Sequence, residues 1–282
     1  MPGPLDRADA LALEQAKHVL ETPDLAIQLA SRVGRPIERL VEKLPVRTRD
    51  LVGSATRTAL EKGLELAVRT LDFREATGAG GSPPLAVRGA PGAASDLAHR
   101  AAVIASGALG GALGAATLAI ELPFSTTLML RSIADHARAQ GEDLSELRVR
   151  LECLGVFAMG GRAASDDAAE AGYFAVRVAL SQAVARAAEQ LGARAMGDLA
   201  AERSAPAVAR LVGLIAQRFG TQVAQKAVAQ LVPIVGALAG AGINSVFIQH
   251  YQKTAWGHFT VRRLERSYGA DEVRRAYEAI PG

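Results

Sequence analysis

The sequence contains a single cysteine, Cys153, in 282 residues. One cysteine excludes an intrachain disulfide framework and any cysteine-rich zinc or iron–sulfur site, and it fits a reducing compartment. The first residues, MPGPLDRADALALEQAK, lack the continuous apolar core of a secretory signal, since charges stand at Asp6, Arg7 and Asp9. We therefore expect a cytoplasmic protein that meets any membrane from its inner face.

Aromatic residues and strand-like patterns are also scarce. Aromatics make up 4% of the chain, whereas hydrophobic residues as a whole make up 49%. Much of that content is alanine, which favours closely packed helices over thick side-chain cores. No run of useful length alternates with the period of a β-strand, and nearly every segment outside the loops has helical periodicity. The sequence therefore predicts an all-α fold, a multi-helix bundle.

Net charge is small, with 32 basic and 29 acidic residues and a formal charge of +3. Such a small excess is weak support for a nucleic-acid partner, and no RRM, KH, zinc-finger or HTH signature is present. The sequence also lacks a GxSxG motif, a P-loop and HExxH-type ligand spacing. We expect no nucleic-acid partner, no metal and no cofactor, and the sequence identifies no catalytic residue.

Charge is entirely absent from two runs, Ala101–Ile120 and Ala227–Ile248. Their apolar residues supply about −3 and −4.5 kcal/mol of transfer energy, reduced by glycine and polar residues, so both are marginal membrane spans. Glycines four apart clear a strip on a helix that another backbone can approach closely. The two runs are expected to form a helical hairpin that serves either central packing or membrane contact, through Gly107, Gly110, Gly111, Gly114, Gly236 and Gly240.

Glycine and proline also divide the chain. Residues 77–94, TGAGGSPPLAVRGAPGAA, break all periodicity and predict a flexible linker. We expect N-terminal amphipathic helices in residues 1–76 and a helical core in residues 95–282, joined in one continuous fold. Within the core, Pro123 is expected to end one helix and Ser125 to begin the next, and Gly269 to separate a last short helix. Two long helices are expected at about 165–191 and 194–219.

A polar stripe lies along the predicted C-terminal helix. Its members are separated by steps of 7, 7, 4 and 3 residues, which place them on one helical face; they are Asn244, Tyr251, His258, Arg262 and Glu265. Arg262 could fork onto phosphate or carboxylate oxygens, and His258 could add a proton-dependent contact. Alternatively, the stripe is a solvated face with ion pairs of little energetic value.

The candidate headgroup-binding residues extend beyond this stripe. Arg263 follows Arg262 and could contact anionic headgroups as well. If Arg262 is buried, it needs a carboxylate partner, because an unpaired buried charge costs several kcal/mol. Glu121 and Asp135, on the helices around Pro123, are the expected partners. Cys153 stands in an apolar run and is expected to be a core residue rather than a nucleophile.

Several longer segments resemble the EcsC protein family. They are ELPFSTTLMLRSIADHARAQGEDLSELRVRLECLGVFAMGG at 121–161, GYFAVRVAL at 172–180, QKAVAQLVPIVGALAGAGINSVFI at 225–248 and GHFTVRRLERSYG at 257–269. The N-terminal LETPDLAIQLASRVGRPIERLVEKLP is also similar, so the resemblance covers roughly residues 8–280 apart from the linker. The family is known mainly from a gene beside an ABC exporter. The resemblance implies a helical, membrane-connected bacterial protein and no particular reaction.

We therefore expect a membrane-associated helical protein that binds lipid or a membrane protein partner at the cytoplasmic face, with an ABC exporter among the candidate partners. The alternative is a soluble helical enzyme of unknown reaction, whose site would combine His258, Arg262 and carboxylates on facing helices. A third possibility is a structural accessory subunit of an exporter. The sequence does not distinguish oligomeric states.

Overall fold

The computed structural model describes residues 5–21, 29, 41–69, 118–159, 172–193, 206–231 and 237–281. These residues form eight α-helices and no β-strand, so the all-α prediction is confirmed for them. In chain order the helices are α1 (Arg7–Glu21), α4 (Val46–Arg69), α6 (Leu118–Ala139), α7 (Leu147–Met159), α8 (Tyr173–Gly192), α10 (Pro206–Leu231), α11 (Ala237–Tyr268) and α12 (Ala270–Ala279). The helix expected at 194–219 is α10, which lies further along the chain.

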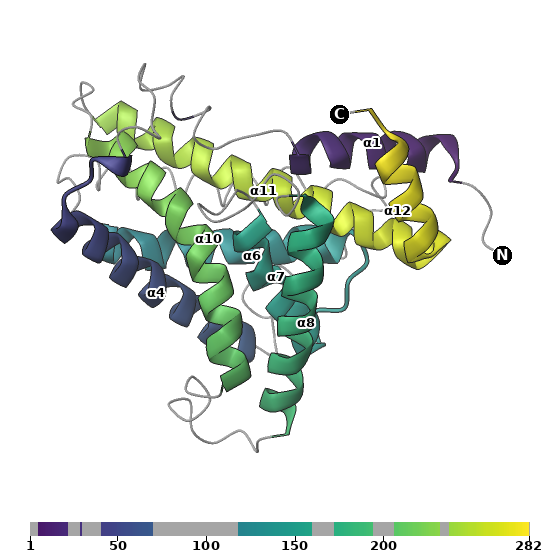
Figure 1. The fold of residues 1–282 in the computed structure, drawn as a ribbon, viewed down its shortest axis with the longest axis horizontal. Helices are drawn as coiled ribbons and strands as arrows, with labels where there is room; N and C mark the ends of the chain where they lie inside the picture. The colour runs from purple at the N-terminus through teal and green to yellow at the C-terminus, as the bar shows by residue number, and fades with distance from the viewer. Residues whose placement is uncertain are drawn as a thin grey trace, which may run out of the picture.

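The main core lies where α4, α6, α7, α8, α10 and α11 pack together (Figure 1). Helix α7 is buried from Val149 to Ala158, including Arg150 and Glu152, because its neighbours cover it on several sides. Cys153 is 2% exposed within this core, as expected, and burial raises the pKa of its thiol far above the ordinary value. A thiol held protonated is a packing group rather than a nucleophile.

A second, smaller hydrophobic cluster joins α1 and α12 to the C-terminal half of α11. Both described ends of the chain therefore lie at the same end of α11, away from the point where that helix begins (Figure 1). Lys17 strengthens this arrangement by donating hydrogen bonds to the carbonyl oxygens of Tyr277 (3.1 Å) and Ile280 (2.7 Å) at the end of α12. A cation at that position complements the helix dipole.

Helix α6 continues through Pro123, where the sequence predicted the end of one helix and the start of another at Ser125. That prediction was wrong. Proline lacks the backbone N–H that would bond to the carbonyl of residue 119, so α6 passes through Pro123 with one intrahelical hydrogen bond fewer. The Ser125 and Thr127 hydroxyls also donate back, to the carbonyl oxygens of Leu122 (3.2 Å) and Pro123 (2.9 Å).

Two glycines end helices by adopting left-handed backbone angles. Gly141 has φ of 80° and closes α6, with its N–H bonded to the Arg138 carbonyl (3.0 Å) and the Glu142 N–H bonded to the Ala137 carbonyl (3.0 Å). This pair of bonds is the Schellman pattern, which turns the chain sharply after a helix. Gly269, with φ of 89°, separates α11 from α12 as expected.

Most of the predicted glycine strip lies outside the described residues. This applies to Gly107, Gly110, Gly111, Gly114 and Gly236, and to the predicted linker at 77–94. Gly240 belongs to α11, but its surroundings are not described either. The glycine-rich hairpin therefore stays a prediction. None of the helices, over the residues that the structure describes, is both long and apolar enough to cross a bilayer.

Candidate functional site

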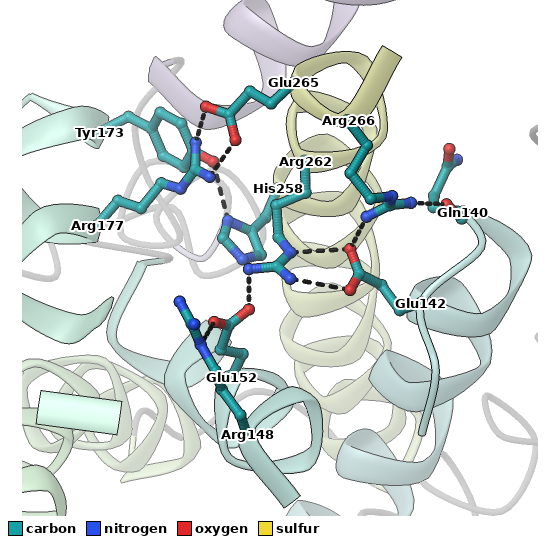
Figure 2. A network of polar contacts seen from close by, with 10 residues as sticks. All are labelled: Gln140, Glu142, Arg148, Glu152, Tyr173, Arg177, His258, Arg262, Glu265 and Arg266. Atoms are coloured by element: carbon teal, nitrogen blue, oxygen red, sulfur yellow. Dashed lines mark hydrogen bonds and ion pairs between the residues drawn. The ribbon is translucent and has the colours of Figure 1, made fainter. Parts of the chain in front are cut away.

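Helix α11 carries two separate clusters of polar side chains on its inner side. The first, here called the Glu121 cluster, consists of Glu121, Lys226, Gln230 and Asn244. The second, the Arg262 cluster, consists of Glu142, Arg148, Glu152, Tyr173, Arg177, His258, Arg262, Glu265 and Arg266 (Figure 2). Asn244 and Arg262 are eighteen residues apart on one helix, a separation of about 27 Å. The predicted stripe is therefore divided, with Asn244 in the Glu121 cluster and His258, Arg262 and Glu265 in the Arg262 cluster.

The Glu121 cluster ties together the beginning of α6, the end of α10 and the beginning of α11. Lys226 Nζ donates to Glu121 Oε1 over 2.7 Å, and both side chains are buried, with 0% and 5% exposure. Asn244 Nδ2 donates to the same oxygen (2.8 Å), and Gln230 Nε2 donates to Glu121 Oε2 (3.3 Å). One carboxylate thus accepts hydrogen bonds from two other helices.

In this cluster the buried charges of Glu121 and Lys226 stabilise each other. Burial by itself raises the pKa of Glu121, but the Lys226 charge and the three donors together hold that pKa below its ordinary value. Burial lowers the pKa of Lys226, and Glu121 offsets part of that effect. A buried ion pair gains little over an apolar pair of the same shape, yet losing one partner leaves an uncompensated buried charge. The cluster therefore holds three helix ends in one particular arrangement.

Large apolar side chains are exposed beside the Glu121 cluster. Ile120 is 81% exposed and Phe124 is 53% exposed, and they lie one helical turn apart on the same face of α6. The surrounding helix ends, residues 118–125, 222–231 and 237–248, contain no charged residue in the sequence besides the paired Glu121 and Lys226. We call these three helix ends the apolar end of the bundle.

In the Arg262 cluster, Arg262 is held between two carboxylates (Figure 2). Its Nε and Nη2 donate to the two oxygens of Glu142 over 2.8 and 2.9 Å, and its Nη1 pairs with Glu152. Arg266 also pairs with Glu142 and donates to the Gln140 carbonyl, just before the Gly141 turn. The turn after α6 therefore delivers Glu142 to the face of α11.

A second forked ion pair links α8 to α11. Arg177 Nη1 donates to Glu265 Oε1 (2.6 Å), and its Nη2 pairs with Glu265 Oε2. On α7, Arg148 Nε donates to Glu152 Oε1 over 3.3 Å. Arg148 is the most accessible arginine of these three, with 54% side-chain exposure against 16% for Arg177 and 20% for Arg262.

His258 lies between these ion pairs and is 2% exposed. Its Nδ1 is 2.9 Å from the Tyr173 hydroxyl. Burial, together with the positive charges of Arg177 and Arg262, holds the pKa of His258 well below its ordinary value of 6.5. A lowered pKa favours the neutral imidazole near neutral pH, and the proton-dependent contact expected from the sequence stays a prediction.

The structure places Asn244, Tyr251 and His258 in the interior, with exposures of 0%, 0% and 2%. The ring of Tyr251 belongs to an aromatic cluster with Phe157, Phe219 and Phe247, at centroid distances of 5.0, 5.8 and 5.3 Å. Its described neighbours are thus core residues rather than members of either polar cluster.

Arg262 has carboxylate partners outside its own helix, but they are not the expected ones. Its partners are Glu142 and Glu152, whereas Glu121 lies in the other cluster, near Asn244. Asp135 forms an ion pair with Arg138 over 3.0 Å. The expected pairing failed because the length of α11 separates the apolar end from Arg262.

Arg263, the other basic candidate, lies on a different face of α11. It donates to Gln140 Oε1 (3.1 Å) and pairs with Asp9 of α1 (2.8 Å), with 32% of its side chain exposed. Headgroup binding by any of these candidate residues stays a prediction.

Sequence reasoning missed Lys226, Glu152, Arg177 and Tyr173. A signal was present for Lys226, because it is a lone charge in the run AQKAVAQLV; Glu152 precedes the uncharged run CLGVF but follows Arg148 and Arg150. Isolated charges in buried helices are rare unless they are paired. Tyr173 and Arg177 carry no such signal, since their pattern fits an ordinary amphipathic helix.

No group of three or more His, Cys, Asp or Glu side chains is placed to hold a metal ion in the part of the chain that the structure describes. Among known proteins, the family model described as the EcsC protein family matches residues 8–264. No curated protein and no solved structure matches the chain. The family match covers the Glu121 cluster and the Arg262 cluster except Glu265 and Arg266, and it assigns no activity to them.

Proposed function

Since the chain belongs to the EcsC protein family, we propose that it is a membrane-associated helical protein that docks on lipid through its apolar end, at the cytoplasmic face of a membrane. The observation that supports this proposal most strongly is the exposure of Ile120 (81%) and Phe124 (53%). Both side chains lie where one uncharged run, 101–120, leads into α6, beside the second run, 227–248.

The Glu121 cluster explains how such a surface can exist in a charged protein. Glu121 lies between Ile120 and Leu122 in sequence, and an exposed carboxylate there would oppose insertion into lipid. Instead it turns inward to Lys226 and Asn244, so the outer face of α6 keeps its apolar side chains. The ion pair thus leaves Ile120 and Phe124 without a neighbouring exposed charge from these helix ends.

The expected strength of docking follows from the side chains involved. Full burial of Ile120 and Phe124 stabilises by about 1.5–3 kcal/mol each, which is comparable to a weak, reversible anchor. Helix α4 begins at the same end of the molecule (Figure 1). Its first turn exposes Val46 (70%) and places Arg47 in solvent. A basic side chain near an anionic surface adds about 1 kcal/mol.

Binding of the purified chain to lipid vesicles tests the proposal. Ile120→Asp and Phe124→Asp each place a charge on the docking face, and we expect each to weaken vesicle binding by about tenfold or more. Val178→Asp is the matched control, because Val178 is similarly exposed (51%) but lies on α8, outside the apolar end. Flotation with neutral and anionic vesicles measures the effect, and anionic vesicles should bind more tightly.

Equal vesicle binding by all three variants would contradict lipid docking at this end. A chain that associates with native membranes but with neither kind of vesicle would also overturn the proposal, and would instead favour a membrane protein partner such as an exporter.

A further inference from the structure

A pocket of about 80 Å³ opens between α7, α8 and α11, at the Arg262 cluster. Its polar side is formed by Arg148, Glu152, Arg177, His258 and Arg262, and Leu180 and Val184 belong to its apolar side. The volume is several times the 10–15 Å³ or so that one water molecule requires. The pocket lies outside the apolar end, because Arg262 is about 27 Å along α11 from Asn244.

His258 directs a buried donor toward this pocket. The Tyr173 hydroxyl and His258 Nδ1 share one hydrogen bond of 2.9 Å. A phenol is a stronger acid than a neutral imidazole N–H, so we assign the proton of this bond to the phenol, which makes Nδ1 the acceptor. The proton of the neutral imidazole then resides on Nε2. That nitrogen is buried and has no hydrogen-bond partner among the described residues, although His258 lines the pocket.

The arginines around the pocket are charged and fixed in place. Arg177 and Arg262 are each held by forked bonds to carboxylates on another helix, so they need little reordering to meet a ligand. Arg148 bonds to Glu152 through Nε, and its two terminal NH₂ groups have no partner among the described residues. Four arginines face three glutamates across the cluster, which leaves a formal excess of one positive charge.

A buried neutral donor, a partly exposed arginine and a net positive charge all favour an oxyanion. We propose that this pocket binds the phosphate group of an organic phosphate, with Arg148 and His258 Nε2–H as donors and the carbon side of the ligand against Leu180 and Val184. Guanidinium groups suit phosphate because they present several N–H donors in one plane. This inference goes beyond lipid docking, since the pocket and the apolar end use different residues and can fail separately.

Binding of sulfate and inorganic phosphate to the full chain tests the proposal by calorimetry and by ¹⁵N spectra of the histidine rings. We expect both anions to bind and to shift the His258 Nε2 signal. Ser181→Asp, which places a negative charge at the pocket wall, should abolish binding. Arg148→Gln should weaken it by about tenfold, the usual scale for a lost charge-assisted hydrogen bond. Arg138→Gln is the control, being another half-exposed arginine in an i,i+3 pair on α6.

Two further measurements determine whether His258 binds the anion as a neutral ring and whether the phosphate belongs to a lipid or to a soluble metabolite. Sulfate keeps its charge between about pH 6 and pH 8, so its affinity should stay level there if His258 donates as a neutral ring. A water-soluble short-chain phospholipid that outcompetes inorganic phosphate would identify a lipid headgroup, and a soluble sugar phosphate that does so would identify a free metabolite.

Several outcomes would overturn the inference. They are no binding of either anion, equal weakening in Arg148→Gln and Arg138→Gln, unchanged binding in Ser181→Asp, and a steep loss of sulfate affinity as the pH rises through about 6.5. None of these results bears on lipid docking, which the vesicle binding of Ile120→Asp tests separately.

Discussion

Replacing Lys226 with methionine is expected to lower the free energy of unfolding by about 3–5 kcal/mol, the usual cost of breaking a buried ion pair from one side. Lys226 is fully buried and holds a 2.7 Å bond to Glu121, which is itself 5% exposed. Methionine fills similar space but leaves the Glu121 carboxylate buried with only the Asn244 and Gln230 amides as donors. Denaturant unfolding followed by circular dichroism measures the change.

Two companion variants show whether the loss comes from the orphaned charge. Lys62→Met removes an exposed lysine, 61% accessible, whose i,i+3 pair with Glu65 spans 3.8 Å, and it should change stability by less than about 1 kcal/mol. Combining Lys226→Met with Glu121→Gln removes both charges and should restore much of the loss. If Lys226→Met unfolds at the same denaturant concentration as Lys62→Met, the buried Glu121–Lys226 pair is not needed to hold the three helix ends together.

Replacing Arg262 with leucine is expected to cost about 3–5 kcal/mol as well, because two carboxylates lose their shared partner. Glu142 and Glu152 are 4% and 6% exposed, and Arg262 bonds to both. At present burial raises the pKa of Glu142, but Arg262 and Arg266 outweigh burial and hold that pKa below 4.5. Without Arg262, part of the cost should appear as proton uptake by Glu142 on folding.

The neighbouring Arg263 provides the control for this experiment. Arg263→Leu also removes an arginine and an ion pair, but that pair with Asp9 is partly solvated, with 32% and 19% side-chain exposure. It should cost no more than about 1 kcal/mol. The pH dependence separates the two variants further. The lowered pKa of Glu142 adds to the free energy of unfolding above the unfolded pKa of 4.5, and this contribution is lost as the pH falls through the folded pKa. In Arg262→Leu the contribution is removed, so the free energy of unfolding should fall less steeply over the same pH range.

The sequence was sufficient to predict the helices and the face on which the polar stripe lies. Helical periodicity, the cap at Gly269 and the spacing from Asn244 to Arg262 depend only on local geometry, which an amino-acid pattern records directly. The pattern left open whether this face is buried or solvated, and the structure places Asn244 and His258 in the interior.

Partner identities required the fold. Glu142 reaches Arg262 only because the Gly141 turn reverses the chain after α6, and Arg177 reaches Glu265 only because α8 packs beside α11. Such contacts join residues far apart in sequence, and spacing alone does not encode them. The expected pairing of Arg262 with Glu121 failed for this reason, since both lie near α11 but at positions a helix length apart.

Pro123 shows the opposite kind of error, in which a strong local signal misleads. Proline usually marks a helix boundary, yet α6 includes it as the sixth residue from Leu118. The hydroxyls of Ser125 and Thr127 donate hydrogen bonds to backbone carbonyls of the preceding turn, at Leu122 and Pro123. As a result Ile120, Phe124 and Glu121 share one helix, in which the buried carboxylate lies on the face next to the exposed apolar side chains.

Tryptophan fluorescence with brominated lipids tests the central claim, lipid docking by the apolar end, most directly. The chain has a single tryptophan, Trp256, which lies on α11 about 18 Å beyond Asn244. A variant with Trp256→Phe and Phe124→Trp moves the only tryptophan to the apolar end. With vesicles brominated along the acyl chains, we expect strong quenching and a blue shift for this variant and neither for the wild-type chain. Equal quenching of the two proteins, or no quenching of the variant when it is bound, would show that the apolar end does not insert into lipid.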